Sequence, residues 1–239
     1  MDRPEKLSGE ARSVAVHDMF QQIAPRYDLM NRLMTAGQDR TWRRFVVAKA
    51  NLPPNGAALD IATGTGDIAF ELLNSGNAGL SVGADFAPAM MIAGQMRALG
   101  DQVKWVAADA LNLPFSAGRF DAVTHGFLLR NVIDIPRALS EQLRVLKPGG
   151  RVVALDTSPP PQRSILSPVI KFHLGVVIPT VGGILTGSRK AYTYLPQSTI
   201  GFKTPDALAE LFRTAGFVEV GYKRFMFGTI GIVWGTKPT

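Results

Sequence analysis

The sequence predicts an α/β fold built on a mostly parallel sheet with helices on both faces. Between residues 57 and 157, short apolar runs alternate with amphipathic segments of helical period, and Gly or Pro residues separate them. The apolar runs show little polar–apolar alternation, which is typical of parallel strands buried on both sides. In chain order, we expect strands at 57–62, 80–85, 103–109, 120–126 and 151–157, and helices at 66–76, 88–100 and 135–150.

Two segments interrupt this alternation. Residues 14–50 are expected to form one or two helices before the sheet begins. Residues 158–203 begin with Ser-Pro-Pro-Pro and contain the apolar stretch 174–185, which is too short to cross a bilayer and is broken by Pro179. This stretch could form a core helix or hairpin, but we expect that it belongs to a lid. The remaining expected elements, which bring the sheet to seven strands, are a helix at 205–217 and strands at about 218–223 and 226–234.

Composition excludes several kinds of site. The chain has 239 residues, no cysteine and three histidines that are far apart in the sequence. A disulfide framework, a thiol nucleophile, an iron–sulfur cluster and a cysteine-ligated zinc are therefore excluded, and we expect no metal site. The N-terminus is polar and no run of 18 apolar residues occurs, so we predict no signal peptide, no membrane span and a cytoplasmic location.

The formal net charge of +7 is unevenly distributed, because an acidic centre (residues 51–156, −2) lies between two basic flanks. The basic side chains are dispersed and do not form the stripe with interleaved aromatics that nucleic-acid binding requires, so we expect no nucleic-acid partner. Most of them are expected on solvated helix faces. The tightest group is Arg40, Arg43 and Arg44, where we expect peripheral contact with an anionic membrane on the inner face of the cell.

The strongest local signal is the segment 60–67 (DIATGTGD), which follows an expected strand and opens an expected helix. Gly64 and Gly66 let a ligand approach the backbone, and the helix N-terminus offers N–H groups to a carboxylate or phosphate. Asp85 ends the next strand, 19 residues after Gly66, at about the spacing at which an acid binds ribose hydroxyls in nucleotide folds. The glycines with Ala69 also match a dinucleotide-binding fingerprint.

Additional acids distinguish between these ligands. Asp60 and Asp67 bracket the glycine turn, where they would repel a pyrophosphate and stabilise a ligand with an ammonium and a sulfonium. S-adenosylmethionine has both cations, a carboxylate for the helix N-terminus and a ribose for Asp85. Asp109 ends the third expected strand and can reach the adenine amino group. A single Asp is more often a helix cap or turn residue. Four acids at successive strand ends, however, would share the sheet edge at which parallel strands bind ligands, so together they favour a binding site.

Seven segments match the pattern of one known family: IAPRYDLMN (23–31), LDIATGTGDIA (59–69), DFAPAMM (85–91), LPF (113–115), LLRNV (128–132), RVLKPGGRVVALD (144–156) and AYTYLPQS (191–198). From about residue 14 to residue 237 the chain resembles the C-methyltransferases of ubiquinone and menaquinone biosynthesis, which use S-adenosylmethionine. The glycine loop and the Lys-Pro-Gly-Gly turn occur in many methyltransferases, whereas YDLMN, LRN and YLPQS are specific to the quinone branch.

The resemblance implies a class I S-adenosylmethionine-dependent methyltransferase fold, which is Rossmann-like, with N-terminal helices and an inserted lid. It also implies cofactor contacts at Thr65, Ala110 and Gly126, which no argument from spacing supplies. The cofactor-binding residues that we expect are Asp60, Gly64, Thr65, Gly66, Asp85, Asp109, Ala110 and Gly126. Tyr27, Arg130 and Asn131 are implied to lie at or near the reacting centre.

The implied reaction transfers a methyl group to a ring carbon of a demethylated polyprenyl quinol, and family habit favours demethylmenaquinol. A phenol with a pKa of about 10 forms little phenolate at neutral pH, so its hydroxyl needs help to lose a proton. Arg130, a permanent cation, is expected to lower that pKa or hold a water, and Tyr27 to orient the hydroxyl. The alternative role for Arg130 is an ion pair that pins its loop. We expect His125 to be a pocket-wall residue rather than the general base.

We expect one domain over residues 1–239. Its parts are a helical cap (1–50), a cofactor-binding core (51–157), a lid that receives the isoprenoid tail (158–203) and a C-terminal helix with strands (204–239). The alternatives are a benzoquinol acceptor in the ubiquinone pathway, another lipid or phenol acceptor, an NAD-dependent oxidoreductase and a nonenzymatic adenosine-ligand sensor. The oxidoreductase predicts NADH binding and little effect of neutralising Asp60 or Asp67. The sequence does not indicate an oligomeric state.

Overall fold

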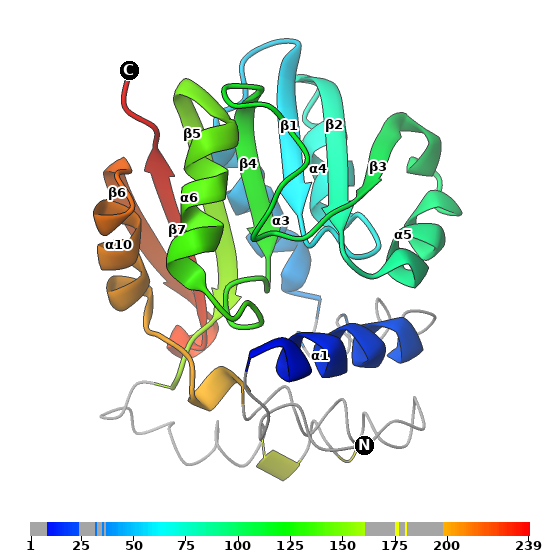
Figure 1. Ribbon diagram of the computed structural model, residues 1–239, viewed down its shortest axis with the longest axis vertical. Coiled ribbons are helices and arrows are strands. Elements are labelled where there is room, and N and C mark those ends of the chain that lie inside the picture. The colour runs from blue at the N-terminus through cyan, green and yellow to red at the C-terminus, as the bar shows by residue number, and fades with distance from the viewer. Residues whose placement is uncertain are drawn as a thin grey trace.

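The computed structural model describes residues 9–23, 32, 35, 37–160, 175–176, 180 and 198–239, and a seven-stranded sheet forms its centre (Figure 1). The spatial order is β3-β2-β1-β4-β5-β7-β6, with parallel pairing from β3 to β5 and β7 antiparallel to both of its neighbours. The strands are β1 (Gly56–Ile61), β2 (Ala78–Asp85), β3 (Val103–Ala107), β4 (Phe120–Gly126), β5 (Leu146–Thr157), β6 (Val218–Phe225) and β7 (Ile230–Thr236). The prediction of a mostly parallel seven-stranded sheet is confirmed.

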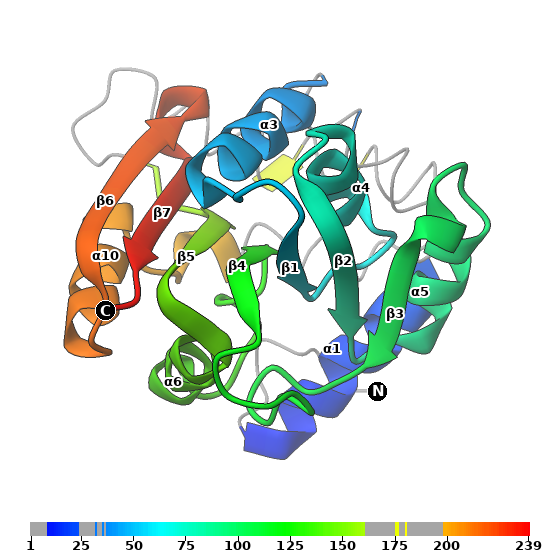
Figure 2. The ribbon, with the colours of Figure 1, turned by 90° about the horizontal axis from the view of Figure 1, so that it is seen from above.

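Helices cover both faces of this sheet (Figure 2). One face is covered by α3 and α4, which share an apolar cluster with β1, β4 and β5, and the other by α6 and α10. Helix α5 packs beside β2 and β3, and α1 lies below the strand ends in Figure 1 and contacts α5. The helices are α1 (Gly9–Ile23), α3 (Asp39–Ala50), α4 (Asp67–Asn74), α5 (Pro88–Gln95), α6 (Ile135–Val145) and α10 (Pro205–Thr214), with short 3-10 segments η3 (Gly100–Gln102) and η5 (Met226–Gly228).

The apolar stripe of α3 explains why this N-terminal helix packs on the sheet. Trp42, Val46 and Ala50 recur at every fourth position, so they lie on one face of the helix. All three are buried, and Trp42 is among the largest fully buried side chains. Helix α3 is therefore part of the core of the fold and not a detachable cap.

The helix before the Lys-Pro-Gly-Gly motif ends earlier than predicted, and the strand after it begins earlier. The helix expected at 135–150 ends at Val145, and Leu146 already pairs with Phe120 as the first residue of β5. Pro148 disfavours a helical conformation at Lys147, and the buried Leu146 fits the sheet, so the helix ends before this turn. The next pairing joins Ala122 to Arg151, so residues 147–150 form an irregular insertion in β5 opposite Asp121.

Other predicted bounds shift by a few residues. The helices expected at 66–76, 88–100 and 205–217 each end earlier, and the last strand starts only at Ile230 because η5 occupies residues 226–228. Strand β3 ends at Ala107, before Asp109. Five parallel strands nevertheless end at one edge of the sheet, where Asp60 is in register with both Gly83 and Thr124. This edge is where α1 lies (Figure 1).

Candidate active site

The glycine loop joins β1 to α4 and is tied to the end of β2. The Gly64 N–H donates to Oδ2 of Asp85 at 2.7 Å, and the Ala87 N–H donates to Oδ1 of Asp85 at 2.8 Å. Burial raises the pKa of Asp85 above its ordinary value, although these backbone donors oppose the shift. Gly66 has a φ of +88°, and a Cβ there would lie 2.6 Å from the Trp105 ring, so only glycine fits.

Asp60 is fully buried at the end of β1 and, among the described residues, accepts hydrogen bonds from two neutral donors. The Thr63 hydroxyl donates to one carboxylate oxygen at 2.7 Å and the Thr124 hydroxyl to the other at 2.8 Å. Burial raises the pKa of Asp60 to about 7, and the two hydroxyls only partly offset the cost of removing the charge from water. In the described part of the chain, no Lys, Arg or His forms an ion pair with Asp60.

Asp67 lines the pocket beside the glycine loop, as expected, but its charge is compensated. Its two carboxylate oxygens pair with Arg43 and with Arg97, each at 2.7 Å, so Asp67 does not offer a free negative charge to a ligand. Arg43 also pairs with Asp39 at 2.5 Å, and Arg97 donates to the Thr65 carbonyl at 3.0 Å. This network ties α3 and the end of α5 to the first turn of α4 and so fixes the glycine loop.

Two adjoining pockets lie at the carboxyl edge of the sheet and share Ala62, Gly64, Gly126 and Phe127. The first, which we call the Asp60 pocket, is also lined by Asp60, Thr63, Thr65, Asp67 and Arg43. The second, the Asp85 pocket, is lined by Asp85 and Asn131 and by the apolar side chains Phe20, Phe86, Met90 and Leu128. The structure therefore brings together the predicted residues Asp60, Gly64, Thr65, Asp85, Gly126 and Asn131 around these pockets.

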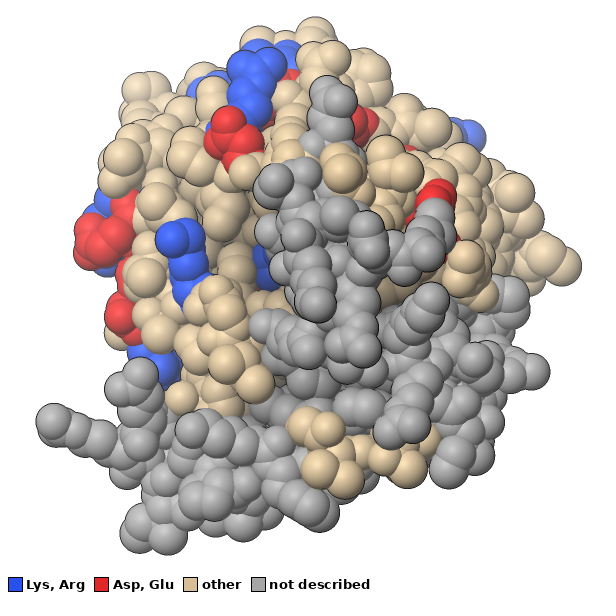
Figure 3. Space-filling view, turned by 60° about the horizontal axis from the view of Figure 1, so that its bottom comes forward, with Lys and Arg blue, Asp and Glu red and all other residues tan. Residues whose placement is uncertain are grey.

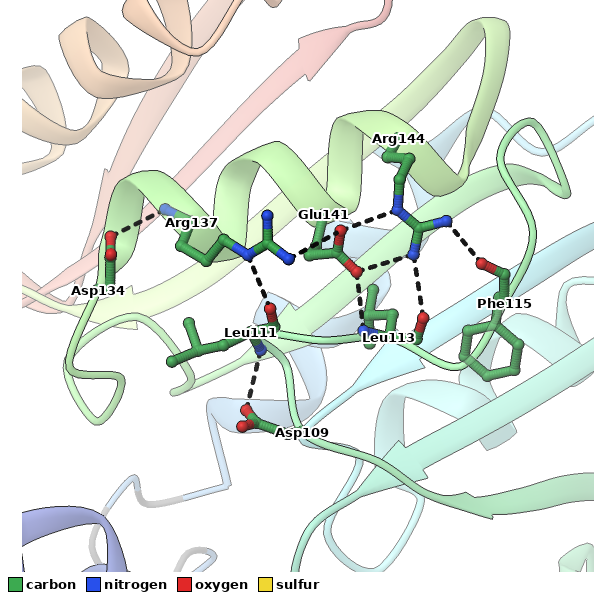
Figure 4. Close-up of polar contacts among 8 residues, drawn as sticks. All are labelled: Asp109, Leu111, Leu113, Phe115, Asp134, Arg137, Glu141 and Arg144. Atoms are coloured by element: carbon green, nitrogen blue, oxygen red, sulfur yellow. Dashed lines mark hydrogen bonds and ion pairs between the residues drawn. The ribbon is translucent and has the colours of Figure 1, made fainter. Parts of the chain in front are cut away.

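Asp109 and Ala110 lie in the loop between β3 and β4 and line neither pocket. Asp109 is exposed and accepts a hydrogen bond from the Leu111 N–H at 2.9 Å, whereas Ala110 is buried (Figure 4). Their predicted contacts with the adenine stay predictions. Tyr27, the YLPQS segment up to Gln197 and most of the predicted lid fall outside the described residues.

Arg130 is buried and forms an ion pair with Asp156 at the end of β5. Its Nη1 lies 2.8 Å from Oδ1 of Asp156, and its backbone N–H donates to Oδ2 at 3.2 Å. The guanidinium also lies over the Phe127 ring, 4.7 Å from the ring centroid. The alternative role considered for Arg130, an ion pair that pins its loop, is thus observed. Its role beside a quinol oxygen stays a prediction, because Arg130 lines neither described pocket.

The loop that Arg130 pins places Phe127 and Asn131 at the Asp85 pocket. Phe127 has a φ of +61°, an uncommon conformation for an aromatic residue that its neighbours must hold. Its N–H donates to the Leu155 carbonyl at 2.7 Å, and the side chain of Asn131 donates to its carbonyl at 2.8 Å. Asn131 therefore fixes the backbone of the pocket wall in addition to lining the pocket.

His125 does not form part of the pocket wall, contrary to expectation. It is fully buried, faces Gln142 of α6 rather than the pockets, and lines neither of them. Burial lowers the pKa of His125 to about 3, and the side chain of Gln142 opposes this only weakly. The imidazole is therefore neutral across the physiological pH range and has no route to a substrate in either pocket.

Some pocket residues escaped the sequence analysis. Arg43 was grouped with two exposed arginines, and Phe20 carried no motif. Arg43 could have been found from its position next to Trp42, which is buried on α3. Phe20 could have been found from its position on the N-terminal helix that packs on α5. Among the described residues, no group of three or more His, Asp or Glu side chains could hold a metal, and no helix is long and apolar enough to span a membrane.

Comparisons with known proteins assign the family. The model of the ubiE/COQ5 methyltransferase family matches residues 6–237. The chain belongs to this family. The Ubiquinone/menaquinone biosynthesis C-methyltransferase UbiE of Desulfotalea psychrophila is 49% identical over 95% of this chain and 92% of its own length. The Demethylmenaquinone methyltransferase of Deinococcus radiodurans is 40% identical over 99% and 98% of the two chains.

Solved structures agree on the fold. A SAM-dependent methyltransferase from Thermotoga maritima superposes with a TM-score of 0.65 over 92% of this chain and 98% of that chain, at 20% sequence identity. The sheet order is therefore that of a class I methyltransferase, as predicted, and the chain is a methyltransferase. The alternative of an NAD-dependent oxidoreductase, which rested on the glycine spacing alone, is wrong.

Proposed function

We propose that this methyltransferase transfers the methyl group of S-adenosylmethionine to a ring carbon of a demethylated polyprenyl quinol, converting demethylmenaquinol to menaquinol. The single observation that carries the cofactor assignment is Asp60, a buried carboxylate that lines a pocket and is not paired with a cation of the described chain. A ligand ammonium or sulfonium would supply the missing charge.

The pockets fit the parts of this cofactor. The Asp60 pocket combines a carboxylate for a cation with the N–H groups of the first turn of α4, which suit a carboxylate. The Asp85 pocket offers one carboxylate among apolar side chains, which suits a ribose beside flat rings. When bound, the sulfonium supplies an electrophilic methyl group. The chain has to orient that group and exclude water.

The described residues support the transfer mainly by positioning. Asn131 and the Arg130–Asp156 pair hold Phe127 and the pocket wall, and alignment of an acceptor with a methyl donor supplies several kcal/mol of rate enhancement. Arg130 is proposed to stabilise the developing phenolate, directly or through the loop that it pins. Tyr27 is proposed to orient the quinol hydroxyl. The transferred methyl group leaves sulfur, and the ring carbon loses its proton to solvent after the phenolate has attacked.

The menaquinone acceptor is supported by the printed name of the Deinococcus relative, whereas the name of the Desulfotalea relative includes both pathways. A benzoquinol acceptor is therefore the second candidate. The test is an assay with radiolabelled S-adenosylmethionine, demethylmenaquinol and the demethylated benzoquinol. We expect faster transfer to demethylmenaquinol. Transfer to neither acceptor, with the cofactor still bound in calorimetry, would discard the acceptor assignment and leave the methyltransferase class.

We also propose that the polyprenyl substrate is taken from an anionic membrane surface by peripheral contact. The described Lys and Arg side chains that are visible in Figure 3 lie beside Asp and Glu and form no continuous basic patch in this view. Arg40 and Arg44 are exposed, but Arg43 is paired with Asp39 and Asp67 and is not available to lipid. Charge reversal at Arg40 and Arg44 should reduce binding to anionic liposomes, and unchanged binding would contradict the proposal.

A further inference from the structure

The loop between β3 and β4 contains no helix, so its backbone groups need partners from elsewhere. Side chains of α6 supply them (Figure 4). Arg144 donates to the carbonyls of Leu113 at 3.0 Å and Phe115 at 2.6 Å, and Arg137 donates to the carbonyl of Leu111 at 3.0 Å. Arginines of α6 therefore hold the carbonyls of three alternate residues along this loop.

Glu141 organises the two arginines. It is buried, its Oε2 accepts the Leu113 N–H at 2.8 Å, and Arg144 contacts both of its oxygens at 2.8 Å. The bonds from Arg144 lower the pKa of Glu141 below its ordinary value despite burial, so the carboxylate is ionised at neutral pH. A buried charged group is costly unless every partner is in place, so this cluster defines one position of the loop against α6.

The contacts lead directly to Asp109. The Leu111 N–H donates to Oδ1 of Asp109, and the Leu111 carbonyl accepts from Arg137. A second bond, from the Asn112 N–H to the Asp109 carbonyl at 3.0 Å, closes the turn. Leu111 therefore links the Asp109 carboxylate to α6, because its N–H binds Asp109 and its carbonyl, in the next peptide unit, is held by Arg137 (Figure 4).

We propose that Glu141, Arg144 and Arg137 form a positioning unit that holds Asp109 in place to recognise the adenine amino group of the cofactor. This inference rests on the adenine contact proposed for Asp109. The unit touches neither the pockets nor the reacting atoms, so it acts through the loop. Its loss should weaken discrimination between purine bases and leave turnover at saturating cofactor unchanged.

The test compares the affinities of the enzyme for S-adenosylhomocysteine and for S-inosylhomocysteine, in which a carbonyl oxygen replaces the adenine amino group. In the unmodified protein we expect adenine to bind about tenfold more tightly, the effect of one hydrogen bond to a charged acceptor. Arg144→Lys keeps the charge but cannot span Glu141, Leu113 and Phe115 together, so the ratio should fall several-fold. Arg137→Ala changes a half-exposed side chain, so it should lower the ratio without threatening the fold.

Two controls separate the possible failures. Arg213→Lys alters an Arg–Glu pair of the same i,i+3 spacing on α10 that contacts no loop, and it should leave the ratio unchanged. Asp109→Asn should abolish the preference for adenine. If Asp109→Asn leaves the ratio intact, the proposed adenine contact fails. If Asp109→Asn abolishes the ratio but Arg144→Lys and Arg137→Ala keep it, or weaken both ligands equally, the positioning unit is disproved.

Discussion

Two aspartates at the carboxyl edge of the sheet, Asp60 on β1 and Asp156 on β5, are equally buried but differently partnered. Asp156 is paired with the guanidinium of Arg130 at 2.8 Å, whereas among the described residues Asp60 accepts hydrogen bonds from two threonine hydroxyls. Burial raises the pKa of both carboxyls; Arg130 opposes this shift at Asp156, and mainly the two hydroxyls oppose it at Asp60, whose pKa rises to about 7. The pair at Asp156 is structural, and Asp60 is the carboxylate that we propose binds a cationic ligand.

The number of acidic residues near the glycine loop overstates the negative charge that a ligand would meet there. Asp67 resembles Asp156, since Arg43 and Arg97 neutralise it. Of the two acids that bracket the glycine turn, only Asp60 keeps an unbalanced charge facing the pocket. Substitutions at the two carboxylate sites should therefore differ in their effects on stability and on ligand binding, and the largest effect is expected at the Arg130–Asp156 pair.

Removing Arg130 should have the largest effect. Arg130→Met leaves Asp156 buried without its cation, so we expect the free energy of unfolding to fall by about 3–5 kcal/mol. Chemical denaturation measures this loss. The double variant Arg130→Met/Asp156→Asn should recover much of the stability, because it removes the orphaned charge. If turnover stays low in the recovered double variant while cofactor affinity is retained, Arg130 also serves the transfer step. If the single variant loses less than about 1 kcal/mol of unfolding free energy, the structural role of the Arg130–Asp156 pair is contradicted.

Asp60→Asn should have the opposite pattern, with little loss of stability and a large loss of binding. We expect the affinity for S-adenosylhomocysteine at pH 8 to fall roughly 10- to 100-fold, because its ammonium loses a charged partner. In the unmodified protein, affinity should rise between pH 6 and pH 8 as Asp60 loses its proton, and the variant should lack this dependence. Calorimetry at three pH values decides the matter. Equal affinities in both proteins would contradict the ammonium contact proposed for Asp60.

The free energy of unfolding of the ligand-free protein should also depend on the protonation of Asp60. Its pKa is raised in the folded state, so its proton contributes stability that is fully present below the ordinary pKa of 3.8 and is lost as the pH rises through about 7. The free energy of unfolding of Asp60→Asn should therefore decline less over this range. Denaturation of both proteins at pH 5 and pH 8 measures the difference.

Thr124→Val should produce a smaller, directional effect. It removes one of the two hydroxyls that stabilise the ionised form of Asp60, so the pKa of Asp60 should rise further, by about one unit. The pH at which S-adenosylhomocysteine affinity reaches half its maximum should move upward by the same amount. A midpoint that does not move would mean that a group other than Asp60 controls binding.

His125→Asn should have the smallest effect on catalysis. The imidazole is already neutral, so the pH dependence of turnover between pH 6 and pH 8 should be unchanged even if the protein is somewhat less stable. A pH–rate profile of the variant tests this. Loss of a titration in that range would restore His125 as a candidate base.

Local periodicity and turn chemistry predicted most of the fold, because the parallel strands and their Gly or Pro boundaries leave a strong pattern in the sequence. The position of Asp60, Gly64, Gly66 and Asp85 at one edge followed from topology alone. What the pattern could not reveal was pairing across distant segments. Arg97 reaches Asp67 from beyond the end of α5, and the partner of Arg130 lies on β5. Such partners decide whether an acid is neutralised.

The sequence also could not predict toward which face of the sheet each side chain of a strand points. His125 ends a strand at the ligand edge, but residues of a strand alternate between the two faces, and His125 belongs to the α6 face while Thr124 faces Asp60. An apolar run buried on both sides has no polar alternation from which that register could be read. The same limit applies to Lys147–Gly150, whose turn signal could not show that it sits inside a strand.

The insertion of β7 between β5 and β6 has a consequence during synthesis of the chain. Strand β7 leaves the ribosome after β5 and β6, yet it supplies the partner that β5 needs, and the Lys237 N–H donates to the Gly150 carbonyl at 2.8 Å. Until β7 emerges, β5 exposes an unpaired edge to other nascent chains. A chain that stalls between β6 and β7 would thus hold most of its core but keep a strand edge that is prone to aggregation.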